Sequence, residues 1–131
     1  MNAMPPIVGR QKPRVLCVDD SPDLAFMVSR MVRSQTDLED AGTLPNADDV
    51  VSAVERCGAT VVVMDLTMPG RPPLDAIREL RARFAWCKVI AYSGYDDAAT
   101  VDGALRAGAW AVVSKHSEFA DLLIAIRGSA E

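Results

Sequence analysis

The chain has 131 residues, of which 50% are hydrophobic and 24% are charged, a composition typical of one folded domain that excludes an intrinsically disordered protein. Its formal net charge is −4 and its basic residues are scattered, so we expect no direct contact with nucleic acid. No stretch approaches the roughly 20 consecutive apolar residues of a membrane helix, and no signal peptide is visible, so we expect a cytoplasmic protein without membrane contact.

Residues 1–12 and residues 13–129 are expected to differ in order. The first segment combines prolines with polar residues and predicts a flexible N-terminal leader. The second segment contains no repeat, linker or low-complexity run and predicts a single domain. The cysteines form no Cys-x-x-Cys or Cys/His pattern, so we expect buried free thiols and not a zinc site or a disulfide framework. They are Cys17, Cys57 and Cys87.

The first part of the chain alternates between strand-like and helix-like segments. Residues 15–18 are continuously apolar, which is typical of a strand that is covered on both faces. Apolar residues recur at helical spacing over 24–31 and again over 47–54. Between these two predicted helices, residues 38–44 contain acidic residues and a glycine, which favours an edge strand.

The second part continues the alternation with three more apolar runs and three more segments of helical spacing. Short connections between strands and helices that alternate predict a parallel sheet with right-handed crossovers, and hence an α/β domain of three layers. The predicted strands are 61–64, 89–91 and 111–113, and the predicted helices are 74–84, 98–105 and 119–126.

Three of the predicted helices have a polar residue at the expected start that can accept hydrogen bonds from free backbone N–H groups. Ser21 is followed by a proline, which favours the first helical position. Asn46 and Ser117 precede two other helices. We therefore expect these three residues to be helix N-caps.

Polar residues follow four of the predicted strands, where ligands of open parallel sheets bind. Asp19 and Asp20 follow the first run, and Asp65 follows the run 61–64. Ser93 and Lys115 follow the last two runs. Three carboxylates, a hydroxyl and an ammonium group are therefore expected at one edge of the sheet.

Three carboxylates at close range would repel one another unless a cation shares the site. Oxygen ligands without histidine or cysteine favour a hard ion such as Mg²⁺, which leaves coordination positions for a phosphoryl oxygen. An aspartate can attack phosphorus to form an acyl phosphate, and Asp65 follows the most apolar strand. We therefore predict that Asp65 accepts a phosphoryl group with the help of Mg²⁺.

Five short motifs in the order of the chain resemble the receiver domain of response regulators in two-component signal transduction. The resemblance extends over nearly the whole chain, and implies a flavodoxin-like fold with strand order 2-1-3-4-5 and five helices. The motifs are Val18-Asp19-Asp20, Met64-Asp65-Leu66-Thr67-Met68-Pro69-Gly70, Ala91-Tyr92-Ser93, Ala107-Gly108-Ala109 and Ser114-Lys115.

The resemblance implies a role for each residue of the predicted site. Asp65 would take a phosphoryl group from a sensor histidine kinase or a histidine phosphotransfer protein. Asp20, Asp65 and the carbonyl of Thr67 would bind Mg²⁺ directly, with Asp19 acting mainly through water. Two further residues would bind the phosphoryl group and switch the partner-binding surface. These are Lys115 and Ser93.

The resemblance implies signalling partners and no metabolic activity, so the protein would assist only its own phosphorylation and dephosphorylation. Its C-terminal part is similar to receivers that often precede a helix-turn-helix output domain. A downstream protein target or a missing output domain would read the switch, and a homodimer stays open. The sequence does not distinguish a stand-alone protein from a fragment, and it identifies neither the kinase, the target nor the phosphoryl-group lifetime.

Two other function classes stay open. A phosphatase of the haloacid-dehalogenase type also uses an aspartyl phosphate, but it needs a second acid where this chain has Thr67. A receiver-like interaction module that works without phosphorylation is the main alternative. It is supported by Val112, where many receivers have an aromatic switch residue, and by Pro72 and Pro73 after the predicted acceptor.

Overall fold

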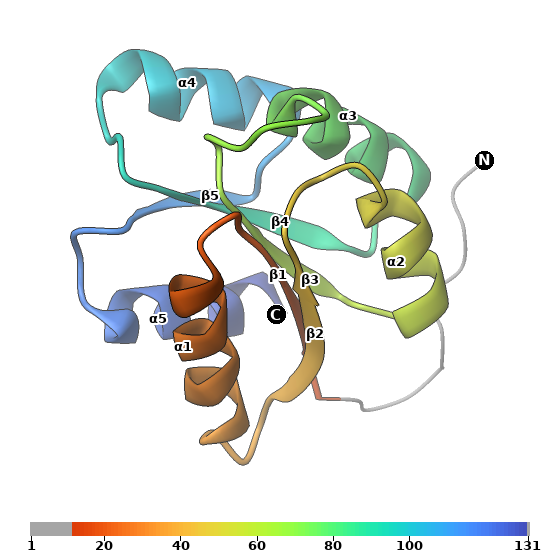
Figure 1. Cartoon of the computed structure of the whole chain (residues 1–131), viewed down its shortest axis with the longest axis vertical. Helices are drawn as coiled ribbons and strands as arrows, with labels where there is room; N and C mark the ends of the chain where they lie inside the picture. The colour runs from red at the N-terminus through yellow and green to blue at the C-terminus, as the bar shows by residue number, and fades with distance from the viewer. Residues whose placement is uncertain (1–11, 131) are drawn as a thin grey trace.

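The computed structural model describes residues 12–130, so residues 1–11 of the predicted leader lie outside the described part. Five strands alternate with five helices, as the sequence predicts (Figure 1). The strands are β1 (Arg14–Val18), β2 (Glu39–Leu44), β3 (Val61–Met64), β4 (Lys88–Ser93) and β5 (Ala111–Ser114). The helices are α1 (Pro22–Arg33), α2 (Val50–Cys57), α3 (Pro73–Arg83), α4 (Ala98–Ala107) and α5 (Phe119–Ser129).

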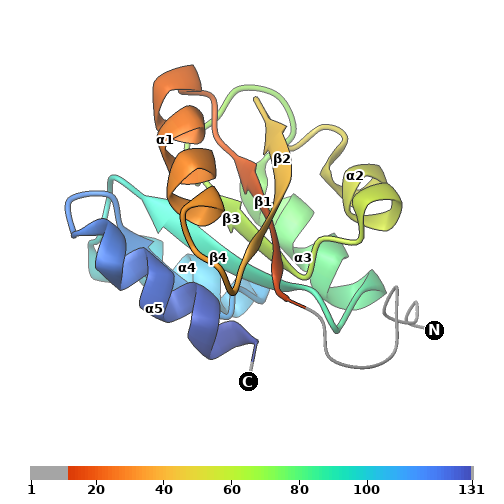
Figure 2. The same ribbon diagram turned by 90° about the horizontal axis from the view of Figure 1, so that it is seen from below.

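All neighbouring strands are parallel, and the sheet has the order β2-β1-β3-β4-β5. Helices α1 and α5 cover one face of the sheet, and α2, α3 and α4 cover the other (Figures 1 and 2). This is the flavodoxin-like arrangement of three layers that the sequence predicts. Because all strands run the same way, the residues that follow them gather at one edge of the sheet.

The two faces of the sheet have separate hydrophobic cores. Side chains alternate along a strand, so Val15 and Cys17 of β1 belong to the core under α1 and α5. Leu16 and Val18 belong to the core under α2, α3 and α4. This explains why the apolar runs are continuous, because every residue of such a strand faces a covering helix.

The helix starts agree with the sequence only in part. Ser21 is the N-cap of α1, and its side chain accepts a hydrogen bond from the N–H of Leu24 at 3.3 Å. The predictions for Asn46 and Ser117 were wrong, because the N-caps of α2 and α5 are Asp49 and Glu118. Asn46 caps a turn before α2, and the hydroxyl of Ser117 donates instead to the carbonyl of Ser114.

The cysteines are free thiols, as predicted, but the prediction that all of them are buried was wrong for Cys57, which lies at the C-terminal end of α2 and is partly exposed. Cys17 and Cys87 are buried, and burial raises the pKa of each thiol to about 12. Both are therefore protonated at neutral pH and contribute to packing. Within residues 12–130, no helix has the length and apolar character needed to cross a membrane.

Candidate functional site

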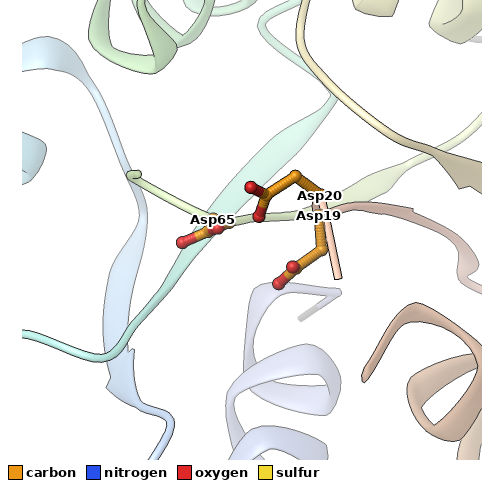
Figure 3. A group of neighbouring side chains, drawn as sticks. All are labelled: Asp19, Asp20 and Asp65. Atoms are coloured by element: carbon orange, nitrogen blue, oxygen red, sulfur yellow. The ribbon is translucent and has the colours of Figure 1, made fainter. Parts of the chain in front are cut away.

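Three aspartates meet where the central strands β1 and β3 end. Asp19 and Asp20 follow β1, and Asp65 follows the neighbouring β3 (Figure 3). The N–H of Asp65 donates to the carbonyl of Val18 at 2.9 Å, so strand pairing continues up to the acid. One carboxylate oxygen of each aspartate lies within 4.8 Å of those of the other two. The structure thus brings together the three acids that the sequence predicts at this edge.

The three acids differ in exposure. Asp19 and Asp65 are only 3% and 5% exposed, whereas Asp20 faces solvent. Burial raises the pKa of Asp65 above its ordinary value, although the Thr67 N–H and Lys115 partly oppose this effect. A hollow of about 360 Å³ between α1 and the end of β2 includes Asp19 and Asp20 in its lining. Molecules in solution can therefore reach this side of the cluster.

Lys115, which follows β5, supplies the positive charge of the cluster. Its Nζ lies 2.8 Å from Oδ2 of Asp19 and 3.3 Å from Oδ1 of Asp65. Partial burial disfavours the charged amine, but the hydrogen bond to Asp19 and the charge of Asp65 outweigh this and raise the pKa of Lys115. The ammonium group also lies 5.9 Å from the centre of the Tyr92 ring. Lys115 is therefore held charged, between two of the three acids.

Ser93, the last residue of β4, and Thr67, on the loop after β3, lie around this cluster. The N–H of Thr67 donates to Oδ1 of Asp65 at 3.2 Å. Ser93 is fully buried, and its Oγ accepts a hydrogen bond from the N–H of Tyr95 at 3.0 Å. Its carbonyl accepts from the N–H of Lys115 at 2.7 Å, which ties the two strand ends together. Ser93 therefore borders the site with its hydroxyl bonded to the following loop.

The donor set can be compared with what a metal ion requires. Among residues 12–130, the grouping of potential metal ligands found at this edge consists of carboxylates alone, with no histidine or cysteine. Oxygen ligands at this spacing suit a hard divalent cation, and a formal charge of −3 against one ammonium leaves an excess of negative charge. The chemistry of the donor set therefore fits Mg²⁺.

Sequence reasoning missed two contacts at this edge. Nε2 of His116 lies 3.2 Å from the carbonyl oxygen of Gly94, and so joins the loops after β5 and β4. Asp48 accepts a hydrogen bond from the N–H of Arg71, on the loop after Asp65. Each contact joins residues more than 20 positions apart in the chain, and no local pattern in the sequence indicates such a pairing.

The family model described as the response regulator receiver domain matches residues 15–127. The chain belongs to this family. The match covers all five strands apart from Arg14, the first residue of β1, and nearly all of the last helix, which agrees with the fold and with the position of the acids at the strand ends.

Curated relatives carry the receiver as part of longer proteins. A protein-glutamate methylesterase/protein-glutamine glutaminase from Nitrobacter hamburgensis is 38% identical over 76 residues, which are 57% of this chain and 20% of the relative. The nitrate/nitrite response regulator NarL of Escherichia coli is 27% identical over 124 residues, 94% of this chain and 57% of the regulator. The chain thus matches between a fifth and somewhat more than half of the length of these relatives.

Solved structures agree on the fold. The response regulator domain of CheB from Thermotoga maritima has a TM-score of 0.83 and 26% identity, with 92% of this chain and 97% of that chain covered. A LuxR-family two-component response regulator from Aurantimonas has a TM-score of 0.83 and 25% identity, with coverage of 90% and 84%. This chain is therefore similar to receivers from both kinds of regulator.

Proposed function

We propose that this receiver takes a phosphoryl group onto Asp65 from a phosphohistidine, in a reaction that depends on Mg²⁺. An oxygen of the Asp65 carboxylate attacks phosphorus, the phosphorus–nitrogen bond of the phosphohistidine breaks, and the imidazole nitrogen leaves with the electron pair. The observation that carries the proposal is the meeting of three carboxylates within 4.8 Å, two of them paired with Lys115. The donor would be a sensor histidine kinase or a histidine phosphotransfer protein.

Four residues would hold the ion in this proposal. Asp20 and Asp65 would offer carboxylate oxygens directly, Thr67 would offer its backbone carbonyl, and Asp19 would act mainly through water. When bound, Mg²⁺ neutralises charge on the phosphoryl oxygens. Since Asp20 is exposed while Asp19 is buried and paired with Lys115, the chain itself favours Asp20 as the direct ligand.

Two residues would bind the phosphoryl group once it is on Asp65. Lys115 is already 3.3 Å from an oxygen of Asp65, so its ammonium can pair with a phosphoryl oxygen after a small movement. Ser93 would turn its hydroxyl from the N–H of Tyr95 to the phosphoryl group. That exchange would free the loop before α4 and so change the surface that partners recognise.

The wider role would be signalling in the cytoplasm, with residues 13–129 as the receiver and 1–12 as a flexible leader. Two kinds of relative, a methylesterase and transcriptional regulators, carry this domain beside other sequence. A downstream protein or an output domain would recognise the surface that phosphorylation changes. We propose neither direct nucleic-acid binding nor membrane contact by this domain. The protein would not turn over a metabolic substrate.

Phosphorylation by a small phosphodonor tests this function. Incubation with phosphoramidate and Mg²⁺ should add one phosphoryl group, because the acceptor and its neutralising charges belong to this one chain. Intact-mass spectrometry measures the addition, and Asp65→Asn should abolish it because the amide cannot act as the nucleophile. Wild-type protein that stays unmodified under these conditions would contradict phosphotransfer and would favour a receiver-like interaction module that works without phosphorylation.

A further inference from the structure

The loop that follows Asp65 is held at its far end by a carboxylate from another part of the chain. Asp48 lies between β2 and α2, and its Oδ1 accepts a hydrogen bond from the backbone N–H of Arg71 at 2.8 Å. These two residues are 23 positions apart in the sequence. Both loops follow carboxyl ends of parallel strands, so the bond joins them along the edge where the acids lie.

The contact between Asp48 and this loop is close and well defined. The N–H of Asp48 donates to Oδ1 of Asn46 at 2.9 Å, which fixes the turn that presents the carboxylate. Gly70 has φ +88, and a Cβ added there would lie 2.6 Å from Oδ1 of Asp48. Two features therefore favour glycine at position 70: the positive φ of the backbone, and the close approach of the Asp48 carboxylate, which leaves no room for a side chain.

Arg71 is also held on its other side. Its guanidinium pairs with Glu79 of α3 at 2.5 Å, and both side chains are half-buried. The backbone of Arg71 is thus bound to the β2–α2 loop and its side chain to α3. This double attachment fixes the point where the chain leaves the loop and approaches Pro72 and Pro73 at the start of α3.

The near end of the same loop is attached to Asp65, the proposed phosphoryl acceptor. The N–H of Thr67 donates to Oδ1 of Asp65 at 3.2 Å. Met68 and Pro69 are the two residues between Thr67 and Gly70, and proline has a fixed φ. A segment this short, bound at both ends, leaves the backbone of Thr67 little freedom relative to Asp65.

We propose that Asp48 is a positioning residue for phosphoryl transfer to Asp65, and this inference rests on the proposed function. Asp48 acts through the loop, because its hydrogen bond to Arg71 keeps Thr67 in register with Asp65. Loss of the Asp48 oxygen that accepts this hydrogen bond lets the loop shift. Small shifts in the geometry of reacting groups reduce rates strongly. The carbonyl of Thr67, one of the proposed Mg²⁺ ligands, shifts with it.

Three single variants distinguish the effect of the hydrogen-bonding oxygen of Asp48 from the effects of its charge and of its contribution to folding. Asp48→Ala removes both the oxygen and the charge, whereas Asp48→Asn removes the charge and keeps an oxygen that can accept from Arg71. Asp49→Ala is the matched control, because Asp49 is an adjacent exposed aspartate whose side chain makes no capping hydrogen bond. Intact-mass time courses with phosphoramidate give the phosphorylation rate constant, and titration gives the Mg²⁺ dissociation constant.

Asp48→Ala should lower the rate constant at saturating Mg²⁺ by about threefold to tenfold, and it should also weaken Mg²⁺ binding. Asp48→Asn and Asp49→Ala should both stay close to wild type. A purely structural role predicts a lower Tm for Asp48→Ala with an unchanged rate constant for the folded protein, and that result would overturn the proposal. So would an Asp48→Asn variant as slow as Asp48→Ala.

The two proposals fail in different ways. Wild-type protein that takes no phosphoryl group contradicts the proposed function and removes the basis of the role of Asp48. Wild-type protein that is phosphorylated, together with an Asp48→Ala variant of equal rate and equal Mg²⁺ affinity, contradicts only the role of Asp48.

Discussion

Lys115 shows how individual residues balance charge at the site. Its ammonium pairs with Asp19 and Asp65, which are both buried, while Asp20 is exposed. A buried carboxylate without a partner is costly, so the lysine makes the arrangement of two buried acids possible. Asp20 is exposed and takes part in neither of these two ion pairs. In the proposed function it is therefore the acid most available to a cation.

Two variants should therefore differ in their effect on Mg²⁺ binding. Asp20→Ala removes a proposed ligand and should weaken the affinity for Mg²⁺ by about tenfold or more, because charged oxygen ligands dominate binding of this ion. Lys115→Ala removes a competing positive charge and should leave the affinity unchanged or increase it, while phosphorylation slows. Calorimetric titration of both variants checks this, and an unchanged affinity in Asp20→Ala would refute the assignment of the metal ligand.

The residues that meet at the site were predictable because each follows a recognisable strand. Asp19, Asp20, Asp65, Ser93 and Lys115 all come directly after a predicted strand or within two residues of its end. Their partners were not predictable, because side-chain pairing across loops depends on loop conformation and has no periodic signal in the sequence. The pairing of Lys115 with Asp19 is an example.

At the scale of elements, the edge strand β2 is attached to α1 by Asp40. Its carboxylate accepts hydrogen bonds from the hydroxyl of Ser29 at 2.5 Å and from Nε of Arg33 at 2.9 Å. It also accepts from the N–H of Gly42 at 2.9 Å, next to an irregularity where the pairing with β1 skips Ala41. The polar residues that indicated an edge strand thus include one that holds the edge in place.

The attachment through Asp40 predicts a dependence of stability on pH. Burial disfavours the Asp40 carboxylate, but the hydrogen bonds from Ser29, Gly42 and Arg33 outweigh burial and lower the pKa below its ordinary value. A lowered folded-state pKa stabilises the protein above the unfolded value of about 3.9, and this contribution is lost as the pH falls through the folded value. Asp40→Asn should therefore be less stable than wild type at pH 7, by on the order of 1 kcal/mol.

Urea unfolding of both proteins at several pH values measures this difference. The difference should begin to shrink as the pH falls below about 4, where the unfolded wild type takes up the proton first, and it should be lost once the pH falls through the lowered pKa of the folded carboxylate. Glu39→Gln is the control, because Glu39 is exposed and its pairing with Arg14 is longer, at 3.4 Å. A difference between Asp40→Asn and wild type that stays constant with pH would contradict this role for the ionised carboxylate.

Element boundaries were less predictable than the elements themselves. The start of α1 was correct because Ser21 and Pro22 together form a strong signal. The start of α2 was predicted three residues early, because Asn46 and Ala47 belong to a turn whose apolar residue is buried without being helical. Ala47 is apolar because it is buried in this turn, and its position only happens to fit the helical spacing of the apolar residues that follow it.

At the scale of the whole molecule, the parallel sheet brings distant parts of the sequence to one edge. Asp19 and Lys115 are separated by most of the domain, and yet their side chains form an ion pair. The alternation of apolar strands and amphipathic helices was sufficient to predict this arrangement, since parallel strands end at the same edge. The same fold is found in the response regulator domain of CheB and in a LuxR-family response regulator, so the fold alone does not specify an output.

The central claim is that Asp65, and not its close neighbours Asp19 and Asp20, receives the phosphoryl group. Sodium borohydride reduces an acyl phosphate to an alcohol, so a phosphorylated aspartate is converted into homoserine, which peptide mass spectrometry locates. After treatment with phosphoramidate and Mg²⁺, we predict homoserine at position 65 alone, and none when Mg²⁺ is left out. Homoserine at position 19 or 20, or a stable phosphate on His116 with position 65 unchanged, would contradict the account.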